Sequence, residues 1–109
     1  MPDRSLISTH VLDASTGTPA QGISVTLTRG SDVASGVTDA QGRIADLGPA
    51  SLPPGHYRLI FETGRYFADR DVETFYPAVE IVFEILAEAS HYHVPLLLSP
   101  CAFTTYRGS

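Results

Sequence analysis

The sequence has little of what several common classes of protein require. Only one of its 109 residues is a cysteine, so no disulfide can form within the chain and nothing demands an oxidising compartment. Lysine and arginine total 7 against 12 for aspartate and glutamate, and the net charge of −5 argues against nucleic acid or an anionic membrane as a partner. No stretch is apolar enough to span a bilayer, and residues 1–5 lack the apolar run of a signal peptide. These features predict a cytoplasmic protein.

The motifs of several enzyme classes are also missing. The sequence contains no glycine-rich phosphate loop, no Gly-x-Ser-x-Gly turn of a serine hydrolase and no Cys-x-x-Cys pair. It has no internal repeat and no low-complexity tract. We therefore expect one domain over residues 1–109, long enough to bury roughly two-thirds of its unfolded surface, and no phosphoryl-transfer or serine-hydrolase activity.

What is present is a series of short alternating segments punctuated by glycine and proline. This pattern predicts an all-β sandwich, because side chains of a half-buried strand alternate between core and solvent. The only credible helix is the short segment 64–70. Strands are expected at 6–13, 22–28, 33–38, 43–47, 56–63 and 79–86, and as two extended segments joined by a Ser-Pro turn within 90–109.

The segment 90–109 carries the most distinctive residues. Alternation places His91 and His93 on one face, while Tyr92, Val94, Leu96 and Leu98 face the core. Pro95 cannot donate to a strand ladder, so a bulge or a gap in pairing is expected there. Cys101 is interpreted as a core or interface residue, because no base lies near it in the sequence.

Two imidazoles on one strand face suit either metal ligation or a general base with a partner, although exposed histidines on a polar face give the same pattern. His10 lies within the first strand, where a lone histidine is often structural. Arg43 follows a Gln-Gly turn, and its planar guanidinium could bind a carboxylate or an imide edge. The terminal segment 106–109 ends the chain with a phenol and a guanidinium. That segment could also be a tail whose arginine pairs with an acidic neighbour.

Several motifs together closely resemble the 5-hydroxyisourate hydrolases, the transthyretin-related enzymes of urate breakdown. The resemblance covers nearly the whole chain, and the terminal Tyr-Arg-Gly-Ser is its most specific motif. In the hormone carrier transthyretin the fold is shared, but the histidines, the arginine and this ending are replaced. The motifs are Ile-Ser-Thr-His-Val-Leu-Asp (7–13), Thr-Gly-Thr-Pro-Ala (16–20), Asp-Ala-Gln-Gly-Arg (39–43), His-Tyr-His-Val-Pro-Leu-Leu-Leu-Ser-Pro (91–100) and Tyr-Arg-Gly-Ser (106–109).

The resemblance implies a role for each matching residue. His10, Arg43 and His93 match the catalytic residues of the family, whereas His91 is not a principal catalytic residue. The segment 101–103 departs from the usual pattern, without touching a site residue. The residues implied to bind substrate are His10, Arg43, Tyr106, Arg107, Gly108 and Ser109.

The family also implies an architecture and a reaction. The architecture is a transthyretin-like β-sandwich of two four-stranded sheets with one short helix. Its assembly is a homotetramer, a dimer of dimers, with active sites in a channel at the dimer–dimer interface. The reaction is hydrolysis of 5-hydroxyisourate to 2-oxo-4-hydroxy-4-carboxy-5-ureidoimidazoline in purine catabolism. Water attacks a ring amide carbonyl with histidine assistance, and neither a cofactor nor a metal is needed.

Two other functions remain open on the sequence. One is a transthyretin-like carrier that binds a small aromatic ligand in the channel without turnover, against which the retained site residues argue. The other is a metalloprotein in which His10, His91 and His93 form an open zinc site, although a neighbouring arginine disfavours a cation.

Overall fold

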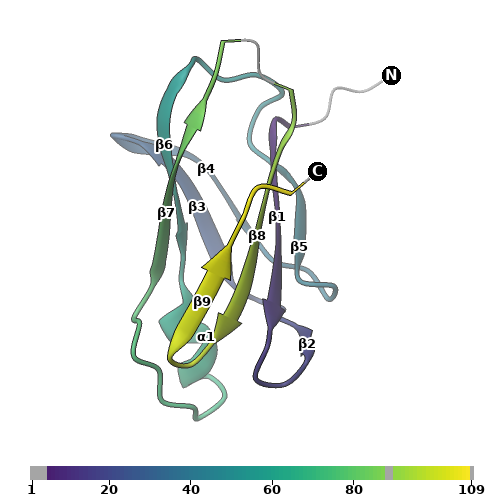
Figure 1. The fold of residues 1–109 in the computed structure, drawn as a ribbon, viewed down its shortest axis with the longest axis vertical. Coiled ribbons are helices and arrows are strands. Elements are labelled where there is room, and N and C mark those ends of the chain that lie inside the picture. Colours follow the sequence, from purple (N-terminus) through teal and green to yellow (C-terminus); the bar gives the residue numbers. More distant parts are fainter. Residues whose placement is uncertain (1–4, 88–89, 109) are drawn as a thin grey trace.

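Two sheets stack face to face, and a single short helix lies near one end of them (Figure 1). The computed structural model describes residues 5–87 and 90–108. The predicted all-β sandwich with one short helix is confirmed. Its elements are β1 (Ile7–Asp13), β2 (Thr18–Pro19), β3 (Ser24–Arg29), β4 (Ser31–Val37), β5 (Arg43–Leu47), β6 (Gly55–Phe61), α1 (Thr63–Ala68), β7 (Val79–Ile85), β8 (Tyr92–Ser99) and β9 (Ala102–Thr105).

One sheet has the predicted four strands, in the order β4-β3-β6-β7, and the other has five. The fifth strand is the two-residue β2, too short to show an alternating pattern in the sequence. The whole length of β1 pairs with β8 on one edge. β5 and β2 therefore share the other edge of β1. β5 pairs with the first part of β1, Ile7 to His10, and β2 pairs with Leu12 and Asp13 at the end of β1. The second sheet is therefore also four strands wide.

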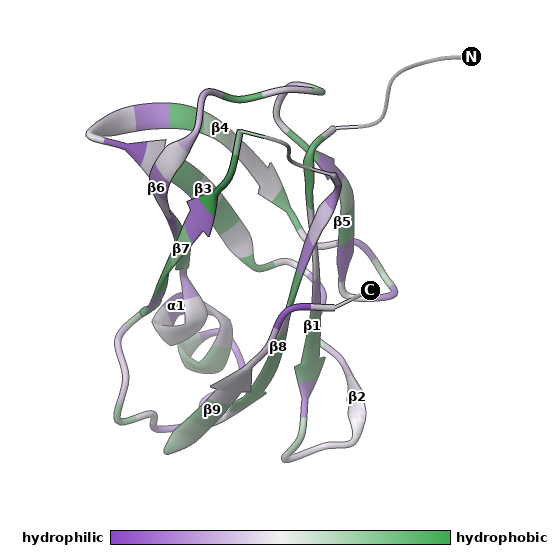
Figure 2. Ribbon diagram, turned by 45° about the horizontal axis from the view of Figure 1, so that its top comes forward, coloured by the Kyte–Doolittle hydropathy of each residue, from purple (hydrophilic) through white to green (hydrophobic). Residues whose placement is uncertain are grey.

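The core lies between the sheets, where their inward faces are apolar. Hydrophobic segments run along strands of both sheets in Figure 2. Val11, Leu96 and Phe61 are fully buried, and the prediction that Tyr92, Val94, Leu96 and Leu98 face the core is confirmed. Of the two interpretations of Cys101, the core was wrong, because the residue lies exposed in the turn between β8 and β9, and the interface stays a prediction.

Pro95 interrupts pairing on one side of β8 only. The register of β8 with β1 runs without a shift from Ile7↔Tyr92 to Asp13↔Leu98. Pairing with β9 ends at Leu96↔Thr105, and beyond Pro95 a single bridge joins His93 to Gly108. The predicted gap is therefore confirmed on the β9 side, where the chain after β9 runs beside β8.

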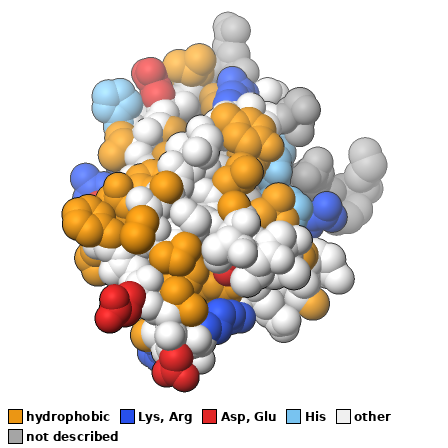
Figure 3. All heavy atoms as spheres, turned by 60° about the horizontal axis from the view of Figure 1, so that its bottom comes forward, with side chains coloured by type: hydrophobic (Ala, Val, Ile, Leu, Met, Phe, Trp, Pro, Cys, Tyr) orange, Lys and Arg blue, Asp and Glu red, His pale blue; other side chains and the backbone are white. Residues whose placement is uncertain are grey.

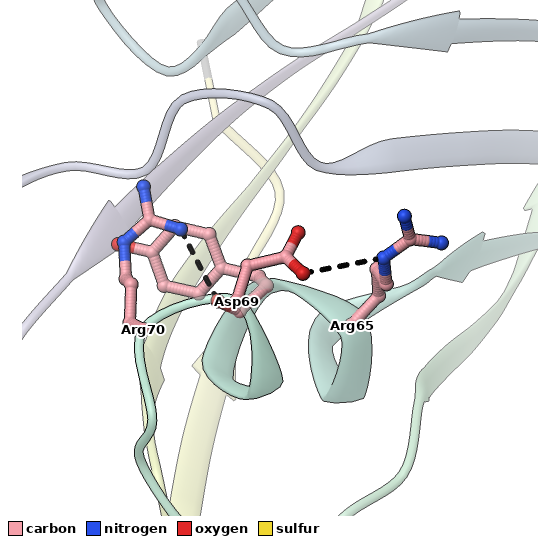
Figure 4. Close-up of polar contacts among 4 residues, drawn as sticks. Arg65, Asp69 and Arg70 are labelled. Atoms are coloured by element: carbon pink, nitrogen blue, oxygen red, sulfur yellow. Dashed lines mark hydrogen bonds and ion pairs between the residues drawn. The ribbon is translucent and has the colours of Figure 1, made fainter.

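Helix α1 is attached to the five-stranded sheet through Tyr66. Its hydroxyl donates a 2.9 Å hydrogen bond to Oδ2 of Asp13 at the end of β1, and burial together with Asp13 raises the pKa of Tyr66 to about 12. The Arg70 guanidinium lies 3.7 Å from the centre of the Tyr66 ring. The exposed Arg65–Asp69 pair, at 3.4 Å, contributes little stability (Figure 4). No helix in the described residues is long and apolar enough to cross a membrane.

Replacing Thr63 with valine is expected to raise the free energy of unfolding by about 1 kcal/mol. Thr63 is fully buried, and among the described residues its Oγ1 has no hydrogen-bond partner. Valine fills a similar volume without the unpaired hydroxyl. Urea denaturation measures the change. The matched control is Thr38→Val, because the buried Thr38 hydroxyl donates to the Ala20 carbonyl and accepts from the Ile23 N–H. That variant should be less stable than wild type, and equal losses in both variants would contradict the interpretation of Thr63.

Candidate active site

Three strands of the five-stranded sheet bring the predicted histidines and arginine together on the face that points away from the core. The register places His10 on β1 beside Arg43 on β5 and Pro95 on β8, and it places Ser8 beside His93. Because side chains alternate along a strand, all of these residues share the outward face. All of them except Pro95 border an open cavity of about 460 Å³, which is lined by Ser8, Thr9, His10, Arg43, Ile44, Ala45, His91 and His93.

Ser8 connects the two histidines of the C-terminal segment. Its hydroxyl oxygen lies 2.7 Å from Nε2 of His91 and 2.8 Å from Nδ1 of His93. Nδ1 of His91 lies 3.1 Å from the Ser5 carbonyl oxygen. Ser8 was not among the predicted site residues, although its position two residues before His10 places both on one face of the strand. His91 was predicted to lie outside the principal residues, whereas the structure places it in the same cavity.

The turn that precedes β5, residues 39–42, contacts both His10 and Arg43. Nε2 of His10 lies 2.8 Å from the Gln41 carbonyl oxygen, which only accepts, so Nε2 carries a hydrogen and Nδ1 of the neutral ring is bare. The Asp39 carboxylate accepts from the backbone N–H groups of Gln41 and Arg43, each at 2.9 Å. The turn leaves Arg43 exposed at the rim of the cavity.

The surroundings of His93 favour its neutral form. Burial lowers its pKa below the usual value, and the charges of His10, His91 and Arg43 lower it further, while a hydrogen bond to Ser8 acts in the opposite direction. A histidine that stays neutral near pH 7 is able to accept a proton there.

Within the terminal motif 106–109, Gly108 contacts His93. Its N–H donates to the His93 carbonyl at 2.8 Å, and a Cβ added to Gly108 would lie 2.5 Å from Cδ2 of the His93 ring. Tyr106 and Arg107 instead line a separate cavity of about 340 Å³, and the Arg107 guanidinium lies 4.5 Å from the centre of the Tyr92 ring. Ser109 lies outside the described residues.

The three histidines do not form a metal centre in the described part of the chain, where no group of three potential ligands is close enough to hold an ion. Both ring nitrogens of His91 already have hydrogen-bond partners. One nitrogen of His10 and one of His93 are engaged in the same way. The guanidinium of Arg43 on the same cavity would also repel a cation.

Comparison with known proteins agrees with this geometry. The sequence model of the HIUase/Transthyretin family matches residues 7–108. The chain belongs to this family. A mouse 5-hydroxyisourate hydrolase is 44% identical over 115 residues, with 98% of each chain covered. The structure of a 5-hydroxyisourate hydrolase from Klebsiella pneumoniae superposes with a TM-score of 0.90 at 48% identity, over 96% of this chain and 99% of that one.

The HIUase/Transthyretin fold alone does not distinguish an enzyme from a carrier. A transthyretin from Sparus aurata superposes equally well, with a TM-score of 0.90 at 34% identity, over 96% of this chain and 97% of that one. A further sea bream transthyretin, solved in complex with thyroxine, superposes with a TM-score of 0.88. The backbone is therefore common to both classes, and the side chains on the outward face must decide the function.

Proposed function

We propose that this chain is a 5-hydroxyisourate hydrolase that opens the ring of its substrate by histidine-assisted attack of water, giving 2-oxo-4-hydroxy-4-carboxy-5-ureidoimidazoline. The observation that carries the proposal is the convergence of His10, Arg43 and His93 on one open cavity. Relatives at 44% and 48% identity bear the name of this enzyme and are matched over nearly their full length.

In the proposed reaction the water oxygen bonds to a ring amide carbonyl carbon while the water gives a proton to an imidazole. His10 and His93 each present a nitrogen that can accept it. The Arg43 guanidinium donates hydrogen bonds to the oxyanion that forms. The carbon–nitrogen bond then breaks, and the leaving nitrogen takes a proton from an imidazolium. No proton or electron is gained or lost overall, so the step requires no cofactor.

The terminal residues 106–109 are proposed to close and orient this pocket. Gly108 supports the proposal directly, through its backbone contact with His93. Tyr106 is 56% exposed but lines the separate cavity, so its contact with substrate stays a prediction. Arg107 stacks on Tyr92 within the chain, which anchors the segment, so its contact with substrate stays a prediction. The same holds for Ser109.

The proposed assembly is a homotetramer, a dimer of dimers with the active sites at the dimer–dimer interface. Exposed leucines adjoin the site on the outward face. Leu12 and Leu97 are neighbours in register and are 36% and 37% exposed. Figure 3 shows hydrophobic side chains gathered over the end of the molecule that contains the β8–β9 turn. Burying such a surface against a second dimer would stabilise the tetramer.

A cytoplasmic location also stays a prediction, for which the single cysteine, exposed and unpaired, gives support.

Freshly generated 5-hydroxyisourate should lose its ultraviolet absorbance much faster with the protein than without it. The rate should not change after exhaustive chelation, because the proposed chemistry uses only protein side chains. Loss of activity on chelation, with recovery on adding zinc, would favour the metalloprotein. Binding of an aromatic ligand without any acceleration of the decay would instead favour the carrier.

A further inference from the structure

The hydrogen bonds around Ser8 determine which nitrogen of His93 carries a hydrogen. The Ser5 carbonyl oxygen can only accept, so Nδ1 of His91, 3.1 Å away, must be the donor. With His91 neutral, its Nε2 is then bare and must accept from the Ser8 hydroxyl at 2.7 Å. A hydroxyl has one hydrogen, so Ser8 can only accept from Nδ1 of His93 at 2.8 Å. His93 therefore carries its hydrogen on Nδ1, and its Nε2 is bare.

The reverse order of donors is unfavourable. If Ser8 donated to His93, then Nε2 of a neutral His91 would have to be the donor to Ser8. Nδ1 of His91 would then face the Ser5 carbonyl oxygen with a lone pair. Ser8 is 5% exposed and Ser5 is 9% exposed, so water has little access to replace the lost hydrogen bond. One repulsive contact would thus fix the direction of the whole chain of hydrogen bonds.

We propose that Ser8 and His91 are positioning residues that hold the His93 ring in the tautomer with a bare Nε2, making this nitrogen the general base of the hydrolysis. The inference rests on the proposed function. The water proton moves to Nε2 of His93, and no proton passes through Ser8 or His91. Their contribution is to keep the ring oriented and its lone pair available, as an orienting group does for the histidine of a hydrolytic triad.

Two further features agree with this assignment. The lowered pKa of His93 keeps the ring neutral near pH 7, so that its tautomer matters for the reaction. Gly108 fixes the ring from the other side, since a Cβ at that position would come within 2.5 Å of His93 Cδ2. The ring is thereby confined between Ser8 and the terminal segment.

The test compares His91→Ala with His91→Gln. A glutamine side-chain oxygen can take the place of Nε2 and accept from Ser8, whereas alanine leaves the Ser8 hydroxyl free to donate to His93. We expect kcat to fall about 10- to 100-fold in His91→Ala and in Ser8→Ala with little change in KM, less than the roughly 100- to 10,000-fold contributed by an acid or base itself. His91→Gln should retain most of the activity. A purely structural role for His91 would not separate the two replacements in this way, so equal rates for alanine and glutamine would contradict the proposal.

Nitrogen NMR of the histidine rings tests the tautomer without any substrate, because protonated and bare ring nitrogens differ in chemical shift. Wild-type His93 should show a protonated Nδ1 and a bare Nε2 at neutral pH, and Ser8→Ala should show a mixture of tautomers. A protonated Nε2 in the wild type would overturn the assignment. Since this readout does not depend on turnover, the failure of the tautomer assignment remains distinguishable from the failure of 5-hydroxyisourate as the substrate.

Discussion

His93→Ala is expected to lower kcat for 5-hydroxyisourate hydrolysis by about 100- to 10,000-fold, the usual contribution of general acid–base catalysis. The ring lies on the outward face of β8, so its removal takes little from the core. The variant should therefore stay folded, with an unchanged circular dichroism spectrum and assembly size. His10→Ala should lose activity similarly, because the His10 ring lines the same cavity.

The pH dependence of kcat/KM is a second test of the role of His93. Protonation of His93 removes the base, and its lowered pKa moves this loss below about pH 6.5, the ordinary histidine value. The wild-type kcat/KM should therefore hold through neutral pH and fall only on the acid side. The residual activity of His93→Ala should lack this decline. His56→Ala is the control, because this exposed histidine is the second residue of β6 in the opposite sheet and its replacement should leave both rate and profile unchanged. Wild-type turnover in His93→Ala would remove His93 from the mechanism.

Removing residues 106–109 is expected to abolish most of the activity and to cost the fold little. A chain end makes few core contacts, so its loss normally has a small effect on the free energy of unfolding. The truncation nevertheless removes Gly108 from the His93 ring and Arg107 from Tyr92. The rate, measured together with the mass from light scattering, shows whether catalysis is lost within an intact assembly. Dissociation would mean that these residues join one dimer to the other. A truncated protein of unchanged size and full activity would show that the segment is only a tail.

Gly108→Ala is the finer form of the same experiment. The added Cβ would lie 2.5 Å from His93 Cδ2 and 3.3 Å from Pro95 Cγ, so either the ring or the terminal segment must move. Activity should fall while the length and charge of the chain remain the same. Gly17→Ala serves as the control, because it makes the same glycine-to-alanine change where the added Cβ has no atom within 4 Å. Its positive φ of 73° makes some loss of stability expected there, without loss of kcat.

Patterns in the sequence were enough to predict the sandwich, the inward faces of the strands and the family. Alternation in segments such as 92–98 is local, because each strand residue points opposite to its neighbour whatever the strand pairs with. The same local rule placed His91 and His93 on one face. The motifs also named His10, Arg43 and His93 as the residues of one site, although nothing local to any of them shows that the three meet.

The contacts of these residues follow from strand pairing, which local patterns do not encode. Ser8 and His93 lie 85 positions apart in the chain, and the parallel register of β1 with β8 sets them side by side. The pairing of β1 with β5 sets Arg43 beside His10. A shift of one residue in either pairing would turn the side chains to opposite faces, and no pattern within a single strand fixes that register. The direction of the hydrogen bonds through Ser8 depends further on the Ser5 carbonyl, a backbone atom whose position no side-chain motif encodes. Long-range strand pairing is therefore what brings a recognisable set of residues together around one cavity.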